Sequence, residues 1–322
     1  MGTLVGHVLP GLGFLLIGLW HLFNHIKLHA LHPNSYITRT WFPIFKFKYL
    51  ELYLIMGGSA ASVAMELFIR PTRHQPFDAD GTSPSNHLHN FDHSFISMTI
   101  FVYAALAVVL NRTPAKARLE LTQFLAAVAF AQELFLFHVH STDHQGLEGQ
   151  YHFLLQLLIF VSFTTVLMGI GFPKSFLIFF VRSLSICFQG VWFIVTGVML
   201  YTPSLLPKGC AMYYDDGHLW VRCSGDEHLH RAKSLANLLF SWLLIGMTIF
   251  GVFFYLALDE IYGQNVDYIS LNMEVLDDQI QAADETNDDV ESQKKIYCLG
   301  PFKDLFLLKK SALLLAKTRD AW

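Results

Sequence analysis

Residues 151–201 read YHFLLQLLIFVSFTTVLMGIGFPKSFLIFFVRSLSICFQGVWFIVTGVMLY. Two apolar stretches, each long enough to cross a bilayer, meet here at the short segment Gly171-Phe172-Pro173-Lys174. A glycine and a proline in so short a connection indicate a turn. The stretch therefore predicts a tight hairpin of two membrane-spanning helices.

The composition of the whole chain agrees with a membrane location. Hydrophobic residues make up 53% of the 322 residues and charged residues only 15%, whereas soluble domains average about 25% charged residues. Because this number of charged groups is too small to cover the surface of a soluble protein, membrane lipids are the expected surroundings. The net charge is −4, and no basic patch indicates nucleic acid as a partner.

Similar apolar stretches recur along the chain and predict an all-α, polytopic bundle of seven transmembrane helices. The expected spans are about 4–24, 47–69, 92–111, 119–140, 151–172, 175–201 and 234–257. Residues 1–257 would form the transmembrane domain, and residues 258–322 a cytosolic tail. The tail begins with an acidic linker. An amphipathic helix at about 301–317 follows, which either lies on the membrane surface or packs on the bundle.

Lysine and arginine gather in alternate loops, which predicts the orientation. The first and third loops and the tail are rich in Lys and Arg, so they are expected in the cytosol, with the N-terminus outside. Cys210 and Cys223 then share a non-cytosolic loop, where a disulfide can persist. Two unpaired thiols are the alternative.

Histidines and acids cluster at the outer ends of the predicted spans. Glu66 and Glu133 lie in otherwise apolar stretches, where an ionisable group normally faces the bundle interior and has a partner. On one helix face, Glu133 is followed by His140 and His144 at i+7 and i+11. The predicted metal ligands are His93, His140, His152 and Glu133. The residues expected behind them or at the rim are His7, Glu66, Asp92 and His144.

Three interpretations fit these residues. The first is a divalent metal site, with zinc as the expected ion because imidazoles and carboxylates are its ligands. The second is a metal-free Glu–His network that holds the helices together, as in a scaffold. The third is a proton or ion path in a channel or transporter. No fixed motif such as HExxH chooses among them.

A catalytic version of the metal site is a further alternative. Zinc would activate water against a lipid amide or ester, with Glu66 or Glu133 as acid or base. The sequence does not decide whether the protein is an enzyme.

Two further groups of polar residues lie deeper or on the cytosolic side. His21, His25 and His29 share a helical face, and we interpret them as an interfacial extension of the first span rather than a second metal site. Arg182 and Gln189 also share a face and are expected to hydrogen-bond within the bundle. Below Glu66 and Glu133, the polar residues that could form an ion path are few.

Two segments carry a family resemblance. GHVLPGLGFLLIGLW at 6–20 and RSLSICFQGVWFIVTGVMLY at 182–201 resemble the transmembrane protein 45 family, and HSTDH at 140–144 resembles its plant-type branch. The positions that match the family are His7, Glu66, His93, Glu133, His140 and His152. The resemblance implies a seven-helix protein of the plasma membrane or a Golgi-type secretory membrane. It implies no particular reaction. Separately, protein partners or a second copy are expected to bind through the cytosolic tail.

Overall fold

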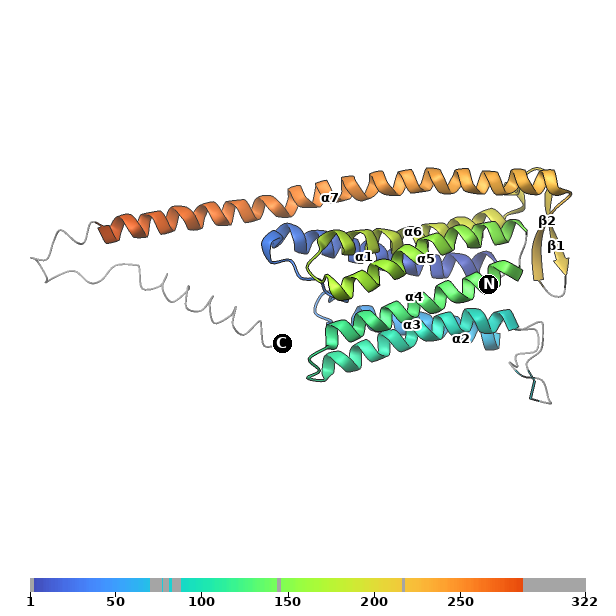
Figure 1. Ribbon diagram of the computed structural model, residues 1–322, viewed down its shortest axis with the longest axis horizontal. Helices are drawn as coiled ribbons and strands as arrows, with labels where there is room; N and C mark the ends of the chain where they lie inside the picture. The colour runs from blue at the N-terminus through green and yellow to red at the C-terminus, as the bar shows by residue number, and fades with distance from the viewer. Residues whose placement is uncertain are drawn as a thin grey trace, which may run out of the picture. The chain divides into compact units, whose positions relative to one another are not determined.

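The computed structural model describes residues 3–69, 77, 81–82, 88–143, 146–215 and 218–285. Within these residues, seven helices are long and apolar enough to cross a membrane, which confirms the predicted all-α polytopic fold (Figure 1). The helices are α1 (Leu4–Leu31), α2 (Leu50–Ala64), α3 (Leu88–Arg112), α4 (Arg118–Asp143), α5 (Leu147–Gly171), α6 (Phe176–Tyr201) and α7 (Asp226–Glu285). The turn between α5 and α6 lies where the sequence predicts it.

The first and last helices extend beyond the predicted spans. Helix α1 continues to Leu31, and α7 continues past residue 257 to Glu285. Residues 258–285 contain no proline, so the helical backbone hydrogen bonds are not interrupted. The chain divides into the compact units Met1–Val266 and Asp267–Trp322. The predicted amphipathic helix at 301–317 lies outside the described residues.

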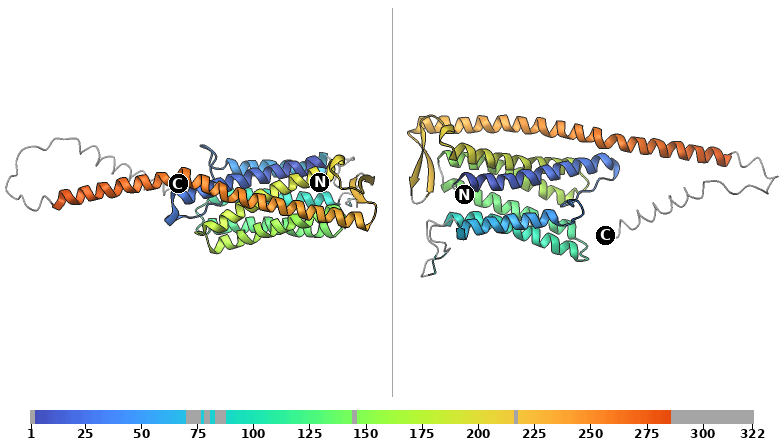
Figure 2. Two further views of the ribbon diagram at one scale, coloured as in Figure 1. Left: turned by 90° about the horizontal axis from the view of Figure 1, so that it is seen from above. Right: turned by 180° about the vertical axis from the view of Figure 1, so that it is seen from behind.

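Neighbours in the bundle follow the chain order with one exception. The pairs α2–α3, α3–α4, α4–α5 and α5–α6 pack side by side, whereas α1 packs along α6 (Figure 2). A Cβ added at Gly18 would lie 2.3 Å from the backbone N of Cys187, and one at Gly190 would lie 2.2 Å from that of Leu15. The α1 and α6 backbones therefore touch, as is common where small residues line a membrane helix interface.

A β-hairpin follows α6. Strands β1 (Cys210–Asp215) and β2 (His218–Cys223) pair antiparallel, and Cys210 and Cys223 form the predicted disulfide. Val221 is buried, and a Cβ added at Gly146 would lie 3.7 Å from its carbonyl oxygen. The hairpin therefore packs against the start of α5, and we call this end of the bundle the hairpin end and the other the opposite end.

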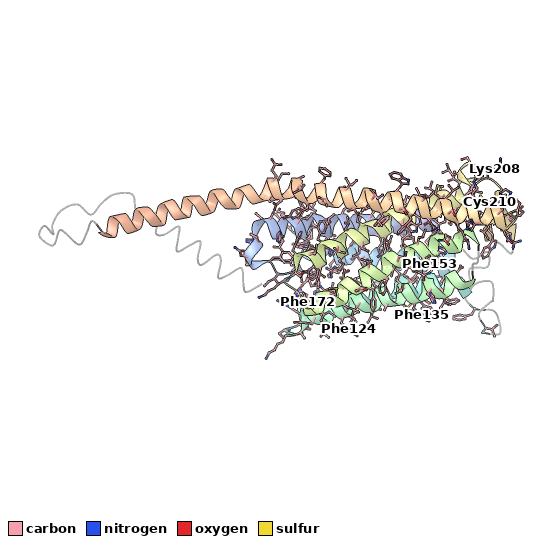
Figure 3. All side chains as sticks on the ribbon, turned by 45° about the horizontal axis from the view of Figure 1, so that its top comes forward. Phe124, Phe135, Phe153, Phe172, Lys208 and Cys210 are labelled. Carbon is pink, nitrogen blue, oxygen red and sulfur yellow. A yellow bond between two sulfur atoms is a disulfide. The ribbon has the colours of Figure 1, made fainter. Side chains whose placement is uncertain are left out.

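The outward surface of the bundle is apolar. Figure 3 labels Phe124, Phe135, Phe153 and Phe172 on this surface, and all are exposed. Helix α7 is attached through large side chains, among them Phe240, whose ring centroid lies 5.0 Å from that of Trp192. Such a surface suits lipid.

Candidate functional site

Ionisable side chains are buried at the hairpin end of the bundle. We call them the hairpin-end cluster: His7 of α1, Glu66 after α2, His93 of α3, Glu133 of α4 and His152 of α5. Each belongs to a different segment, so the cluster forms only when these segments pack together. All these positions are predicted site residues.

Local backbone features place the first members of this cluster. Glu66 lies in a π-helical segment, η2 (Met65–Ile69), and π-helical turns are frequent at functional sites. The carbonyl oxygen of Glu66 accepts a hydrogen bond from Asn90 Nδ2 at 3.4 Å. His7 donates from Nδ1 to the carbonyl oxygen of Thr3 at 3.0 Å. The missing side chain at Gly197 leaves room for His7 beside α6.

Two imidazoles of this cluster pack against the ring of Phe137, and the third stacks on one of them. The ring centroid of Phe137 lies 5.5 Å from that of His152 and 6.3 Å from that of His93. His7 stacks on His152, with centroids 6.1 Å apart and an interplanar angle of 8°. Glu133 lies one turn before Phe137 on α4 and so faces the same way. Phe137 is not among the predicted site residues, because one phenylalanine among 29 carries no distinguishing signal in the sequence.

The described side chains do not form a closed metal site. No group of three His, Cys, Asp or Glu residues among them is placed to hold a metal ion. One predicted ligand, His140, has its backbone in α4, but its side chain lies outside the described part, as does all of His144. Asp92 is half-buried beside His93 in α3. Zinc therefore stays a prediction.

Glu133 is a buried acid of the hairpin-end cluster whose carboxyl group is not fully hydrogen-bonded among the described residues. Its Oε1 atom is buried and has no hydrogen-bond partner among the described residues. An isolated carboxylate is very costly to bury, so such an acid is normally neutralised by a proton or a cation. Glu133 can therefore bind one of these from within the bundle.

A second group of polar side chains is buried at the opposite end. We call it the opposite-end cluster: His21 and His25 of α1, Tyr36 of the following loop, Glu51 of α2, Gln123 of α4 and Arg182 of α6. His21 Nε2 lies 2.7 Å from Glu51 Oε1, and the backbone N–H of Phe42 donates to Glu51 Oε2 at 2.9 Å. Both oxygens of Glu51 are therefore bonded.

The remaining members of the opposite-end cluster are also bonded directly. Tyr36 Oη lies 2.8 Å from His25 Nδ1, and burial raises the pKa of Tyr36, so this hydroxyl stays protonated. Arg182 Nη1 donates to Gln123 Oε1 at 2.7 Å. Arg182 and His25 both pack on Phe179, at 4.6 Å and 5.4 Å.

This burial corrects the interfacial interpretation of the first-span histidines. His21 and His25 are buried, because the loop after α1 folds back over them with Tyr36 and Phe42. Only His29 is half-buried. Glu51 is not among the predicted site residues, although its setting, LELYLIM, is as apolar as that of Glu66.

Polar side chains also lie between the two clusters. Arg182, Gln189 and Thr196 recur every seven residues on the buried face of α6. Gln189 Nε2 donates to Ser162 Oγ at 2.6 Å, and Ser162 Oγ donates to Ser185 Oγ at 3.0 Å. The predicted bonding of Arg182 and Gln189 within the bundle is confirmed. The serines make the line of polar residues denser than the sequence suggests.

A seven-helix bundle with an apolar outer surface and ionisable groups buried at both ends defines a polytopic integral membrane protein. Residues 119–256 match the model of a family of unknown function, DUF716, which is also called TMEM45. The matched residues include the 182–201 segment that carries part of the predicted resemblance; the 6–20 segment lies outside them. The plant-type branch stays a prediction. Because the family description assigns no activity, the function has to be inferred from the two clusters.

Proposed function

We propose that this protein conducts protons across the membrane through the bundle formed by α1 to α6. The observation that carries the proposal is the burial of ionisable groups at both ends of the same helices. Such groups are costly inside a membrane and normally mark ion pathways or proton relays. Glu133 would take up and release the proton at the hairpin end, and His21, His25 and Glu51 would exchange it at the opposite end.

The middle of the bundle supports a path between these groups. Gln189 lies seven residues from Arg182 and from Thr196, which is about 10 Å along the helix in each direction. Gln189, Ser162 and Ser185 form one hydrogen-bonded group at this depth. In the proposed path, water molecules carry the proton between this group and the two clusters.

Proton flux into liposomes tests the proposal. The purified full chain would be reconstituted with a pH-sensitive dye inside, and a potassium gradient with valinomycin would set the membrane potential. We expect the lumen to change pH faster than in protein-free liposomes. Glu133→Gln and Gln189→Leu should each slow the flux by about tenfold or more, because the first removes the carboxyl group that exchanges the proton and the second removes the amide that hydrogen-bonds the water of the path.

Gln150→Leu is a matched control for the glutamine variant. Gln150 is paired with Asn237 of α7, away from the polar line, so this change should leave the flux as in the natural protein. Flux equal to that of empty liposomes, or full flux in the Gln189→Leu variant, would rule out the proposed path.

A divalent metal, with zinc as the predicted ion, is the second candidate. It is supported by the number of imidazoles and carboxylates in the hairpin-end cluster, since these are zinc ligands. Elemental analysis of protein prepared without chelators tests it: stoichiometric zinc that is lost in His93→Ala and His152→Ala would establish the site. The lipid-hydrolase alternative depends on the same measurement, because its water is activated by that metal.

The predicted orientation is part of the proposal. With the N-terminus outside, the disulfide hairpin and Glu133 lie on the non-cytosolic side of a plasma or secretory-pathway membrane. The supporting observation is the distribution of lysine and arginine among the loops. A membrane-impermeant reductant should then reach Cys210 and Cys223 only from the outer side.

A further inference from the structure

The opposite-end cluster contains more hydrogen-bond donors than acceptors. A guanidinium carries several N–H donors and no acceptor. Among the described residues, the only hydrogen bond of the Arg182 side chain goes to Gln123 Oε1. Arg182 is 4% exposed, and its remaining donors have no hydrogen-bond partner among the described residues.

Two neighbouring side chains add further unused polar atoms. Gln123 is 1% exposed, and its Nε2 has no hydrogen-bond partner among the described residues. His25 is fully buried, and the same holds for its Nε2. The other ring nitrogen of His25 is bonded to Tyr36, and a protonated Nε2 is then a donor.

No carboxylate among the described residues forms an ion pair with Arg182. Glu51 is the acid that acts on Arg182 electrostatically, but both its oxygens are bonded, one to His21 and one to the Phe42 N–H. A buried charge without a paired counter-charge is unfavourable. The Arg182 guanidinium therefore has no carboxylate in direct contact with it among the described residues.

We propose that Arg182, Gln123 and His25 form a binding site for a small monovalent anion. The three residues come from α6, α4 and α1, and Arg182 and His25 both pack on the ring of Phe179. Gly169 closes another side: a Cβ there would lie 3.0 Å from Phe179 Cζ and 3.9 Å from Gln123 Oε1. Such tight surroundings favour a halide or a single small carboxylate group.

This site goes beyond the proposed proton path and does not depend on it. A halide and a carboxylate share the chemistry that the site recognises, which is one negative charge that accepts N–H hydrogen bonds. Acetate and chloride therefore serve as separate probes, and gluconate serves as an anion too large for the site.

Thermal unfolding of the purified full chain in detergent tests the site. Melting would be measured at constant ionic strength in sodium chloride, sodium acetate or sodium gluconate. An anion that binds only the folded protein stabilises it. We expect the midpoint to be about 2 to 4 °C higher in chloride or acetate than in gluconate. A larger shift with chloride identifies a halide site, and a larger shift with acetate identifies a carboxylate site.

Gln123→Glu is the decisive variant, because it should fold and yet lose the site. The new carboxylate would take the place of the anion beside Arg182. In gluconate the variant should melt at least as high as the natural protein does in its preferred anion, and its midpoint should no longer depend on the anion. Gln150→Glu, the same change at the hairpin end, should keep the full anion dependence.

Two results would overturn the anion site. One is a natural protein whose melting midpoint is the same in all three salts. The other is a Gln123→Glu variant that keeps the shift seen in Gln150→Glu, because general salt effects act on both variants alike.

Discussion

The two ends of the bundle bury ionisable groups in different ways. At the opposite end the polar side chains are bonded directly to one another, as in the 2.7 Å contact between His21 and Glu51. At the hairpin end two imidazoles pack against the ring of Phe137, and Glu133 Oε1 has no hydrogen-bond partner among the described residues. The bonded network at the opposite end therefore also holds the helices in place, beyond its part in the proposed path, whereas Glu133 has no such bond at Oε1 and contributes less to holding them.

The same isosteric change at the two acids should separate these roles most clearly. Glu51→Gln loses the negative charge that His21 and the Phe42 N–H share, and breaking a buried pair costs about 3 to 5 kcal/mol. Glu133→Gln should change the free energy of unfolding by less than about 1 kcal/mol, since no bond to Oε1 is lost. Denaturant unfolding of both variants in the same detergent measures the difference.

Equal losses in the two variants would remove the distinction between the ends. A large loss in Glu133→Gln alone would point to a structural hydrogen bond or a bound metal at the hairpin end.

The covalent hairpin is the second difference between the ends, and removing it should have a smaller effect. Replacing Cys210 and Cys223 together by serine opens a loop whose ends are 13 residues apart, worth about 3 kcal/mol at most in unfolding free energy. Reductant should lower the melting midpoint of the natural protein and leave that of the double variant unchanged. A reductant effect of equal size in both proteins would mean that the disulfide does not stabilise the fold.

A pair of tyrosine variants gives the finest comparison. Tyr36→Phe removes the hydroxyl that bonds to His25 at 2.8 Å, and should cost about 1 kcal/mol. Tyr201→Phe at the hairpin end removes a bond of 3.4 Å to Glu148 Oε1, which is long and should contribute less. The losses in unfolding free energy of the two variants, measured under the same conditions, show which of the two hydrogen bonds contributes more to stability. A larger loss in Tyr201→Phe would reverse the ranking.

The sequence predicted the spans well because their signal is local. The length of each span can be read from its run of apolar residues, and the position of the turn at 171–174 from the glycine and proline within it. The disulfide could be predicted because the topology puts Cys210 and Cys223 in the same loop. In each case the information lies in neighbouring residues or in the order of the spans.

The candidate site was predicted only as a set of residues. Helix periodicity identifies the buried acids and histidines, but it does not say which side chain lies between them. Phe137 was missed for this reason, and so was the pairing of His21 with Glu51, which depends on the loop after α1 folding back. Contacts between residues far apart in sequence depend on tertiary packing, which a single sequence does not display.

The backbone contact between α1 and α6 also limits the order in which the protein can assemble. Gly190 is synthesised 172 residues after Gly18, which takes roughly 10 to 30 s at typical rates of translation. During this time α1 is already made, but its glycine face and its buried histidines have no α6 to pack against. Helix α1 is synthesised before α6 but can reach its final position only once α6 is made, and a chain that stops before Phe176 leaves His7 and His25 without that cover.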